Sequence, residues 1–253
     1  MRILFPIIFF FYSIFLFGQN DSILVQLQEF GIEEGLSHQL VNAICQDDRG
    51  MMWFGTNYGL NRYDGISFKS YFPENSELKG FQIKRLLKDA NGKIWIFYGK
   101  SSSINLIYHI DIFDPITEQV QSPQDYTNFP FEAPYEDIDF RCFGGGTFIA
   151  IDKKSHVAWQ FDGIQFEAFH KFPFNIIYTN RIDDNHFWIW GNRDFYKYTY
   201  APNNYIYIID NKNRILDSLR IEGRIMYAAN KNHKIYSYPL EQNRNQLIET
   251  DVL

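Results

Sequence analysis

An internal repeat is the sequence feature that most constrains the fold of this chain. The segment 47–55, Asp-Asp-Arg-Gly-Met-Met-Trp-Phe-Gly, returns 42 residues later as Asp-Ala-Asn-Gly-Lys-Ile-Trp-Ile-Phe at 89–97. A second segment, 63–71, returns at 161–169, a little over two such periods later. Looser copies follow at 183–191 and from residue 224. A period near 42 residues is typical of one β-propeller blade, and no stretch keeps the 3.6-residue apolar period of a helical repeat.

Each repeat divides into four short strands. In the first unit the expected strands are 40–46, 51–56, 60–63 and 66–71. The last two are separated by Asp64-Gly65, a strong hairpin signal. Apolar and polar side chains alternate from Ile66 to Lys69, which is typical of a half-solvated outer strand with Ile66 on its apolar face. The sequence therefore predicts an all-β fold, a β-propeller of four-stranded blades.

Aromatic residues make up 19% of the chain, and several recur at the same blade position. Trp53, Trp95 and Trp188 each lie in the second strand of a unit. Such recurrence favours a role in the core between blades over contact with a ligand. The expected blades cover 35–79, 80–122, 135–174, 175–221 and 222–253.

The N-terminus has the layout of a secretory signal peptide over residues 1–18. A positive charge at Arg2 precedes an uncharged apolar stretch, 3–17, and the small residue Gly18 stands at the expected cleavage site. The apolar stretch is shorter than the roughly 20 residues that span a bilayer. The sequence therefore predicts an exported protein, with an uncleaved anchor as the alternative.

The charge balance argues against nucleic acid as a direct partner. The chain has 24 Lys and Arg against 30 Asp and Glu, a formal net charge of −6. A protein that binds a phosphate backbone normally presents a basic surface.

Three stretches of the first unit resemble the two-component regulator propeller repeat: Gly-Leu-Ser-His-Gln-Leu-Val-Asn-Ala-Ile at 35–44, the segment 47–56, and Gly-Leu-Asn-Arg-Tyr-Asp-Gly at 59–65. The resemblance implies the periplasmic sensor domain of hybrid two-component systems and sensor histidine kinases of Bacteroidetes. It also implies seven-bladed rings, oligosaccharide ligands and signalling through a homodimer. This chain is expected to contain about five blades, which is an incomplete set relative to the seven of such a ring. It has no kinase motif, so we expect binding without phosphotransfer, and membrane contact only through a kinase portion outside this chain.

The search for catalytic chemistry is negative. The sequence has no phosphate-binding Gly-rich loop with Lys, no Gly-x-Ser-x-Gly elbow and no His-Glu-x-x-His or Cys-x-x-Cys motif, so we expect no catalytic residue, metal or cofactor. A ligand is expected at the face formed by the loops between blades and by the loops between second and third strands. Aromatic rings beside amide and charged groups suit sugar hydroxyls. The candidate ligand-binding residues are His38, Asn57, Tyr58, Tyr98, Lys100, Arg193 and Asp194.

Two functions from different classes fit these observations. The first is a periplasmic sensing module of a two-component system that recognises an oligosaccharide-type ligand. The alternative is a stand-alone exported propeller, acting as a protein-interaction scaffold or as a lyase-type enzyme. An enzyme would need paired His and acidic residues converging on one face, and the sequence shows no such set.

Overall fold

A computed structural model describes most of the chain after the N-terminal segment. The predicted signal peptide 1–18 lies outside the described residues. The described ranges are 29–99, 107–125, 128–143, 146–181, 186–192, 204–210, 214–221, 225–231, 234–239 and 248–251.

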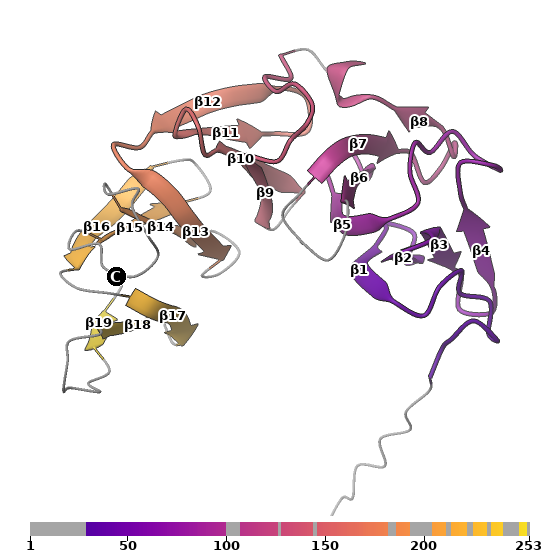
Figure 1. The fold of residues 1–253 in the computed structure, drawn as a ribbon, viewed down its shortest axis with the longest axis horizontal. Coiled ribbons are helices and arrows are strands. Elements are labelled where there is room, and N and C mark those ends of the chain that lie inside the picture. The colour runs from indigo at the N-terminus through magenta and orange to yellow at the C-terminus, as the bar shows by residue number, and fades with distance from the viewer. Residues whose placement is uncertain are drawn as a thin grey trace, which may run out of the picture. The chain divides into compact units, whose positions relative to one another are not determined.

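The described strands form five antiparallel sheets, each with its strands in chain order (Figure 1). The first sheet comprises β1 (Val41–Gln46), β2 (Met52–Thr56), β3 (Gly59–Tyr63) and β4 (Phe68–Tyr71). The second comprises β5 (Ile83–Lys88), β6 (Ile94–Gly99), β7 (Ile107–Phe113) and β8 (Val120–Gln121). The third comprises β9 (Ile138–Phe143), β10 (Thr147–Asp152), β11 (Val157–Phe161) and β12 (Phe166–Lys171).

The fourth sheet comprises β13 (Asn175–Arg181), β14 (His186–Asn192), β15 (Asn204–Asp210) and β16 (Ile215–Ile221). The fifth has three described strands, β17 (Ile225–Lys231), β18 (Lys234–Pro239) and β19 (Ile248–Asp251). Within the described ranges the one helical element is the 3-10 turn η1 (Pro123–Asp125). Four consecutive four-stranded up-and-down sheets are the units of a β-propeller, so the predicted fold class is confirmed.

The strands of the first blade begin and end within two residues of the predicted positions, with one instructive difference. Ile66 was expected on the apolar face of the last strand, but β4 begins only at Phe68 and Ile66 is 91% exposed. The carboxylate oxygen Oδ1 of Asp64 accepts hydrogen bonds from the backbone N–H groups of Ile66 and Ser67, both at 2.8 Å. This Asx turn holds Ile66 outside the strand pairing, and the prediction for its side chain was therefore wrong.

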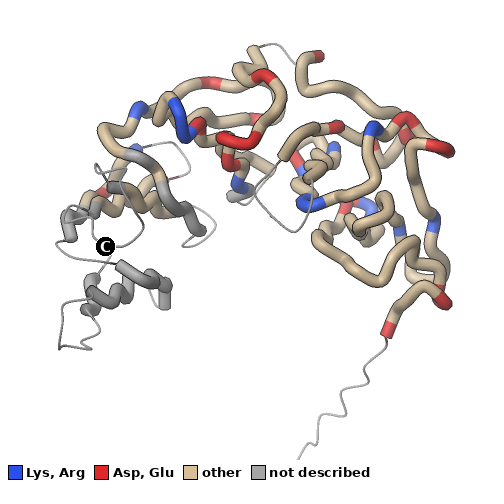
Figure 2. Tube along the Cα trace, in the orientation of Figure 1, with Lys and Arg blue, Asp and Glu red and all other residues tan. Residues whose placement is uncertain are grey.

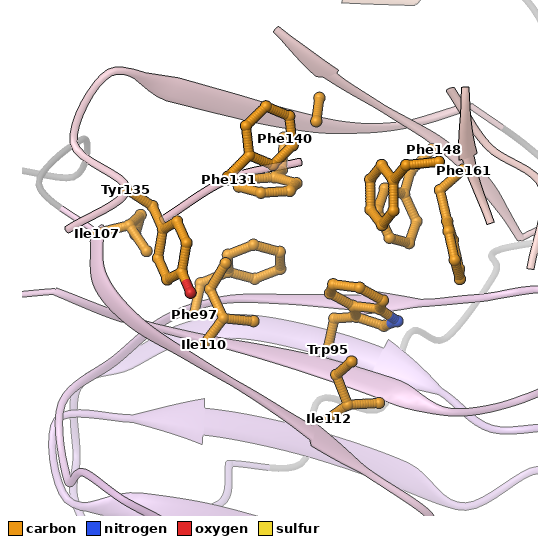
Figure 3. Close-up of a cluster of buried hydrophobic side chains, with 12 residues drawn as sticks. Trp95, Phe97, Ile107, Ile110, Ile112, Phe131, Tyr135, Phe140, Phe148 and Phe161 are labelled. Atoms are coloured by element: carbon orange, nitrogen blue, oxygen red, sulfur yellow. The ribbon is translucent and has the colours of Figure 1, made fainter. Parts of the chain in front are cut away.

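Two of the recurring tryptophans, Trp53 and Trp95, lie between blades, as expected. Trp53 is fully buried and contacts the ring of Phe113 in the second blade, with ring centroids 5.3 Å apart. Trp95 is fully buried and packs edge-to-face against Phe148 and Phe161 of the third blade, at 4.9 and 5.2 Å (Figure 3). Each aromatic cluster thus joins two consecutive sheets, and such pairs contribute beyond the area they bury.

An aspartate six residues before each of these tryptophans fixes the hairpin between the first two strands. Asp47 Oδ2 accepts the indole N–H of Trp53 at 3.0 Å, and Asp89 Oδ2 accepts that of Trp95 at 3.0 Å. The other oxygen of each carboxylate accepts two backbone N–H groups of the turn that follows, in the same positions of both blades. The Asp-to-Trp spacing of the repeat is therefore a hydrogen-bonded unit that couples the turn to the core.

Candidate functional site

The turn between β2 and β3 carries an exposed aromatic ring at one end of the first blade. Tyr58 is 44% exposed. Its ring stacks on that of Phe81, with centroids 4.9 Å apart and planes 23° apart, and it contacts Phe72 at 5.4 Å. Phe72 and Phe81 belong to the crossover between the first two blades and are half-buried. We call these three rings the aromatic platform.

The platform depends on a glycine at the end of the turn. Gly59 has a φ of 90°, and its N–H donates to the carbonyl of Phe81 at 2.8 Å. A Cβ atom at this position would lie 2.5 Å from the backbone oxygen of Tyr71 and 2.7 Å from the ring of Phe72. Only glycine allows the crossover to pass this close to the turn, which brings Phe72 and Phe81 against Tyr58.

Two amide side chains and a lysine lie next to the platform. The Nδ2 group of Asn42 donates to Asn57 Oδ1 and to the carbonyl of Ile83, both at 2.8 Å. Lys84 Nζ donates to the same Asn57 oxygen at 3.5 Å. Among the described residues, no hydrogen bond uses Asn57 Nδ2, Asn42 Oδ1 or the Tyr58 hydroxyl. This end of the blade therefore offers a flat aromatic face with adjacent donors and acceptors.

His38 stands in the segment that leads into β1 and is half-buried. Its ring Nδ1 accepts the backbone N–H of Leu40 at 2.9 Å. The carbonyl of Leu40 in turn accepts the N–H of Asn57 at 3.2 Å. His38 is therefore linked to the β2–β3 turn through one residue of backbone.

Tyr98 was expected in an exposed loop, and the structure places it in the core. It lies in β6, is fully buried, and donates its hydroxyl proton to Asp111 Oδ2 at 2.9 Å. Burial, and next the neighbouring Asp111 charge, raise the pKa of Tyr98 well above its ordinary value. Asp111 also accepts the backbone N–H of Lys79 at 2.8 Å and contacts His109 Nε2 at 2.8 Å. Tyr98 thus anchors the crossover from inside, and the prediction that it lines an exposed surface was wrong.

Lys100, Arg193 and Asp194 lie outside the described residues, so their proposed contacts stay predictions. Of the seven candidates, the structure brings Asn57 and Tyr58 together and connects His38 to them. Four neighbours of the site were missed by sequence reasoning: Asn42, Phe72, Phe81 and Lys84. They lie in the innermost strands and the crossover, where no motif distinguishes a surface position from a buried one.

Over the part of the chain that the structure describes, no group of three or more His, Cys, Asp or Glu is placed to hold a metal ion. Within the same ranges, no helix has the length and apolar character needed to cross a membrane.

Up-and-down sheets of four strands, coupled through Trp-centred cores, define a propeller of repeated blades. The family model of the two component regulator propeller matches residues 35–58, which confirms the resemblance within the first blade. Histidine kinase P4 of Formosa agariphila is 42% identical over 72 residues, which are 28% of this chain and 5% of that protein. The chain therefore spans only a small part of this curated relative.

Solved structures with a similar backbone include two kinds of bacterial protein. One is described as the extracellular domain of a hybrid two component system of B. thetaiotaomicron, with a TM-score of 0.35 and 16% identity, covering 88% of this chain and 35% of that one. Another is virginiamycin B lyase from Staphylococcus aureus, with a TM-score of 0.45 and 14% identity, covering 83% and 69%. The assignment of the blades rests on their strand order and on the family match, and not on these likenesses.

Proposed function

We propose that this chain is the ligand-sensing propeller part of a two-component signalling protein, exported to the periplasm, and that it recognises an oligosaccharide-type ligand. The observation that carries the proposal is the family match over 35–58, which includes the β2–β3 turn that presents Asn57 and Tyr58. The similarity to a histidine kinase over 72 residues supports the same class of protein.

The chemistry of the platform supports a sugar as ligand. The apolar face of a pyranose ring stacks on an aromatic face, and its hydroxyl groups both donate and accept hydrogen bonds. Tyr58 provides an exposed ring that Phe81 holds in place from below. Asn57, Asn42 and Lys84 provide amide and ammonium groups at its edge.

The contribution of this chain is ligand binding, and phosphotransfer belongs to a kinase portion outside it. No phosphate-binding loop or kinase motif occurs in the sequence. Incubation of the purified chain with labelled ATP is expected to leave it unphosphorylated, and incorporation of label would contradict this part of the proposal.

The ligand-binding part is tested with an array of defined neutral and acidic oligosaccharides, followed by calorimetry on each compound that binds. Loss of the stacking ring in Tyr58→Ala is expected to weaken binding about tenfold, equivalent to about 1.4 kcal/mol. Tyr58→Phe keeps the ring and is expected to retain most of the affinity. Tyr63→Ala is the matched control, because Tyr63 lies at the other end of β3 and its hydroxyl donates to Gly65.

The outcomes separate the site from the ligand class. An oligosaccharide that binds Tyr58→Ala as tightly as the unchanged chain would remove the platform from the site. Binding of no oligosaccharide on the array would reject the ligand class and leave the fold assignment intact.

A further inference from the structure

Positive charge is concentrated on the first strands of the sheets, although the chain as a whole is acidic. Figure 2 marks Lys and Arg in blue and Asp and Glu in red along the described residues. The first strands of the first three sheets, β1, β5 and β9, together contain four Lys or Arg residues and a single Asp. The whole chain has a formal net charge of −6. A local excess of positive charge attracts anions to this part of the molecule.

Strand β5 carries three of these cations, Lys84, Arg85 and Lys88, and they differ in their partners. Arg85 and Lys88 each form an ion pair with an aspartate. Lys84 is half-buried and forms no ion pair with any residue that the structure describes. Its Nζ donates to Asn57 Oδ1 at 3.5 Å, which is long for a hydrogen bond, and an ammonium group has three donors. Most of the hydrogen-bonding capacity of Lys84 is therefore available beside the aromatic platform.

Hydrogen bonds to the preceding segment fix the backbone at Lys84. The three successive carbonyl groups of residues 81–83 accept, in this order, the N–H of Gly59 at 2.8 Å, the N–H of Gly99 at 3.1 Å and the Nδ2 group of Asn42 at 2.8 Å. These donors belong to three different strands, β3, β6 and β1. The same segment supplies the lower ring of the aromatic platform. The ammonium group and the platform are thus attached to one fixed backbone, and a preorganised site loses little entropy on binding.

We propose that Lys84 recognises an anion at the aromatic platform, and that the ligand carries a carboxylate or sulfate group next to the sugar ring that stacks on Tyr58. The inference rests on the proposed function and names the charge of the ligand, which that proposal leaves open. An oxyanion at Lys84 replaces the long bond to Asn57 by a charge-assisted hydrogen bond, which is about twice as strong as a neutral one. The oxygen of Asn57 keeps the hydrogen bond from Asn42.

A neutral sugar satisfies Lys84 less well than an acidic one. A ligand that covers the platform removes water from the half-buried ammonium group, and a hydroxyl group accepts a hydrogen bond from it without neutralising its charge. Leaving a desolvated cation without a counter-charge costs free energy, and this cost falls on neutral ligands. A cationic ligand is disfavoured further by repulsion from Lys84. One lysine beside the stacking ring therefore selects acidic ligands against both other classes.

The test compares each acidic compound with a neutral analogue of the same sugar backbone, by calorimetry on the full chain. Uronate-containing and sulfated oligosaccharides form separate arms, and their analogues are the methyl-esterified and the desulfated forms. The unchanged chain is expected to bind an acidic compound about tenfold more tightly than its neutral analogue. In Lys84→Gln the two affinities are expected to become nearly equal, because the affinity for the acidic compound falls and that for the neutral analogue does not.

Two further variants separate recognition of charge from general effects. Lys84→Arg keeps the positive charge and should retain most of the preference for the acidic compound. Lys93→Gln is the matched control, because it removes a positive charge from the β5–β6 turn, at the other end of β5, and should leave the preference unchanged. Added salt should weaken binding of the acidic compound to the unchanged chain more than to Lys84→Gln, because salt screens a partly exposed ion pair.

The outcomes distinguish this inference from the proposed function. Tighter binding of the neutral analogues, or a preference for acidic compounds that Lys84→Gln leaves unchanged, would overturn the inference while the sugar-binding function stands. An equal loss of affinity for both analogues in Lys84→Gln would assign Lys84 a structural role and also overturn it. Binding of no oligosaccharide would reject the proposed ligand class, and this inference with it. A preference confined to the uronate arm or to the sulfated arm would support the inference and identify the oxyanion.

Discussion

Replacing Asp47 by alanine is expected to destabilise the first blade strongly. The carboxylate is 6% exposed and accepts the indole N–H of Trp53 at 3.0 Å, together with the backbone N–H groups of Met51 and Arg49, each at 2.9 Å. In Asp47→Ala the buried indole and the turn N–H groups lose their acceptor. Each unsatisfied buried donor costs about 1–3 kcal/mol, so we expect a total loss of about 2–4 kcal/mol.

The assay is urea unfolding at pH 7, followed by tryptophan fluorescence and near-ultraviolet circular dichroism. Asp64→Ala is the matched control, because Asp64 also accepts two turn N–H groups but is exposed and bonds no buried side chain. Asp47→Ala should lower the urea midpoint clearly more than Asp64→Ala. Equal losses in the two variants would refute the reasoning, because they would show that the bond to buried Trp53 contributes nothing beyond the turn.

The pH dependence gives this prediction a second readout. Burial alone would raise the pKa of Asp47, but hydrogen bonds from Trp53, Met51 and Arg49 outweigh it and lower the pKa below its ordinary value of 3.8. The contribution of Asp47 to stability is therefore complete above about pH 3.8 and is lost as the pH falls toward the lowered pKa. Asp47→Asn should remove this part of the acid-induced loss.

The contribution of the equivalent Asp89 to stability is expected to change with pH in the opposite direction. Asp89 is more deeply buried, and desolvation raises its pKa despite the hydrogen bonds from Trp95 and Lys93. Its contribution is then greatest below its ordinary pKa of 3.8 and declines as the pH rises through the raised value. Asp89→Asn should therefore cost less stability at pH 7 than Asp47→Asn, which the same urea titrations measure.

Two further predictions concern the contacts around the first blade. Gly65→Ala places a methyl group at a φ of 96° with nothing within 4 Å, so it should lower the free energy of unfolding by about 1 kcal/mol, for the left-handed backbone alone. Gly59→Ala should lower it clearly more in thermal unfolding, because its methyl group meets the backbone oxygen of Tyr71. Equal losses in the two variants would contradict the close approach at Gly59. Glu118 accepts hydrogen bonds from Lys69 and Tyr71, and these lower its pKa below 4.5. Its contribution to stability is therefore lost as the pH falls through the lowered pKa. Glu118→Gln should flatten the acid part of a plot of stability against pH, and an unchanged plot would count against this contact between blades.

The sequence was a good guide where structure depends on near neighbours. The Asp-to-Trp spacing and the Asp-Gly hairpin of Asp64 are local hydrogen-bonding patterns, and they appear in the structure where the repeat placed them. The same local reasoning located Asn57 and Tyr58 in the β2–β3 turn. It did not identify Phe81 as the ring beneath Tyr58, because that contact depends on how closely the crossover passes Gly59.

The sequence by itself determined the repeated four-stranded blade, because turn chemistry, alternation and the buried tryptophan act over a few residues. Only the tertiary structure decided which repeated side chains face solvent. The sequence predicts a loop position for Tyr98, but its side chain is buried against Asp111. It predicts a strand position for Ile66, but that side chain is exposed. The burial of a side chain depends on neighbours that folding brings from a distant crossover or an adjoining blade. The local sequence pattern cannot predict these contacts, because the residues involved are far apart in the chain.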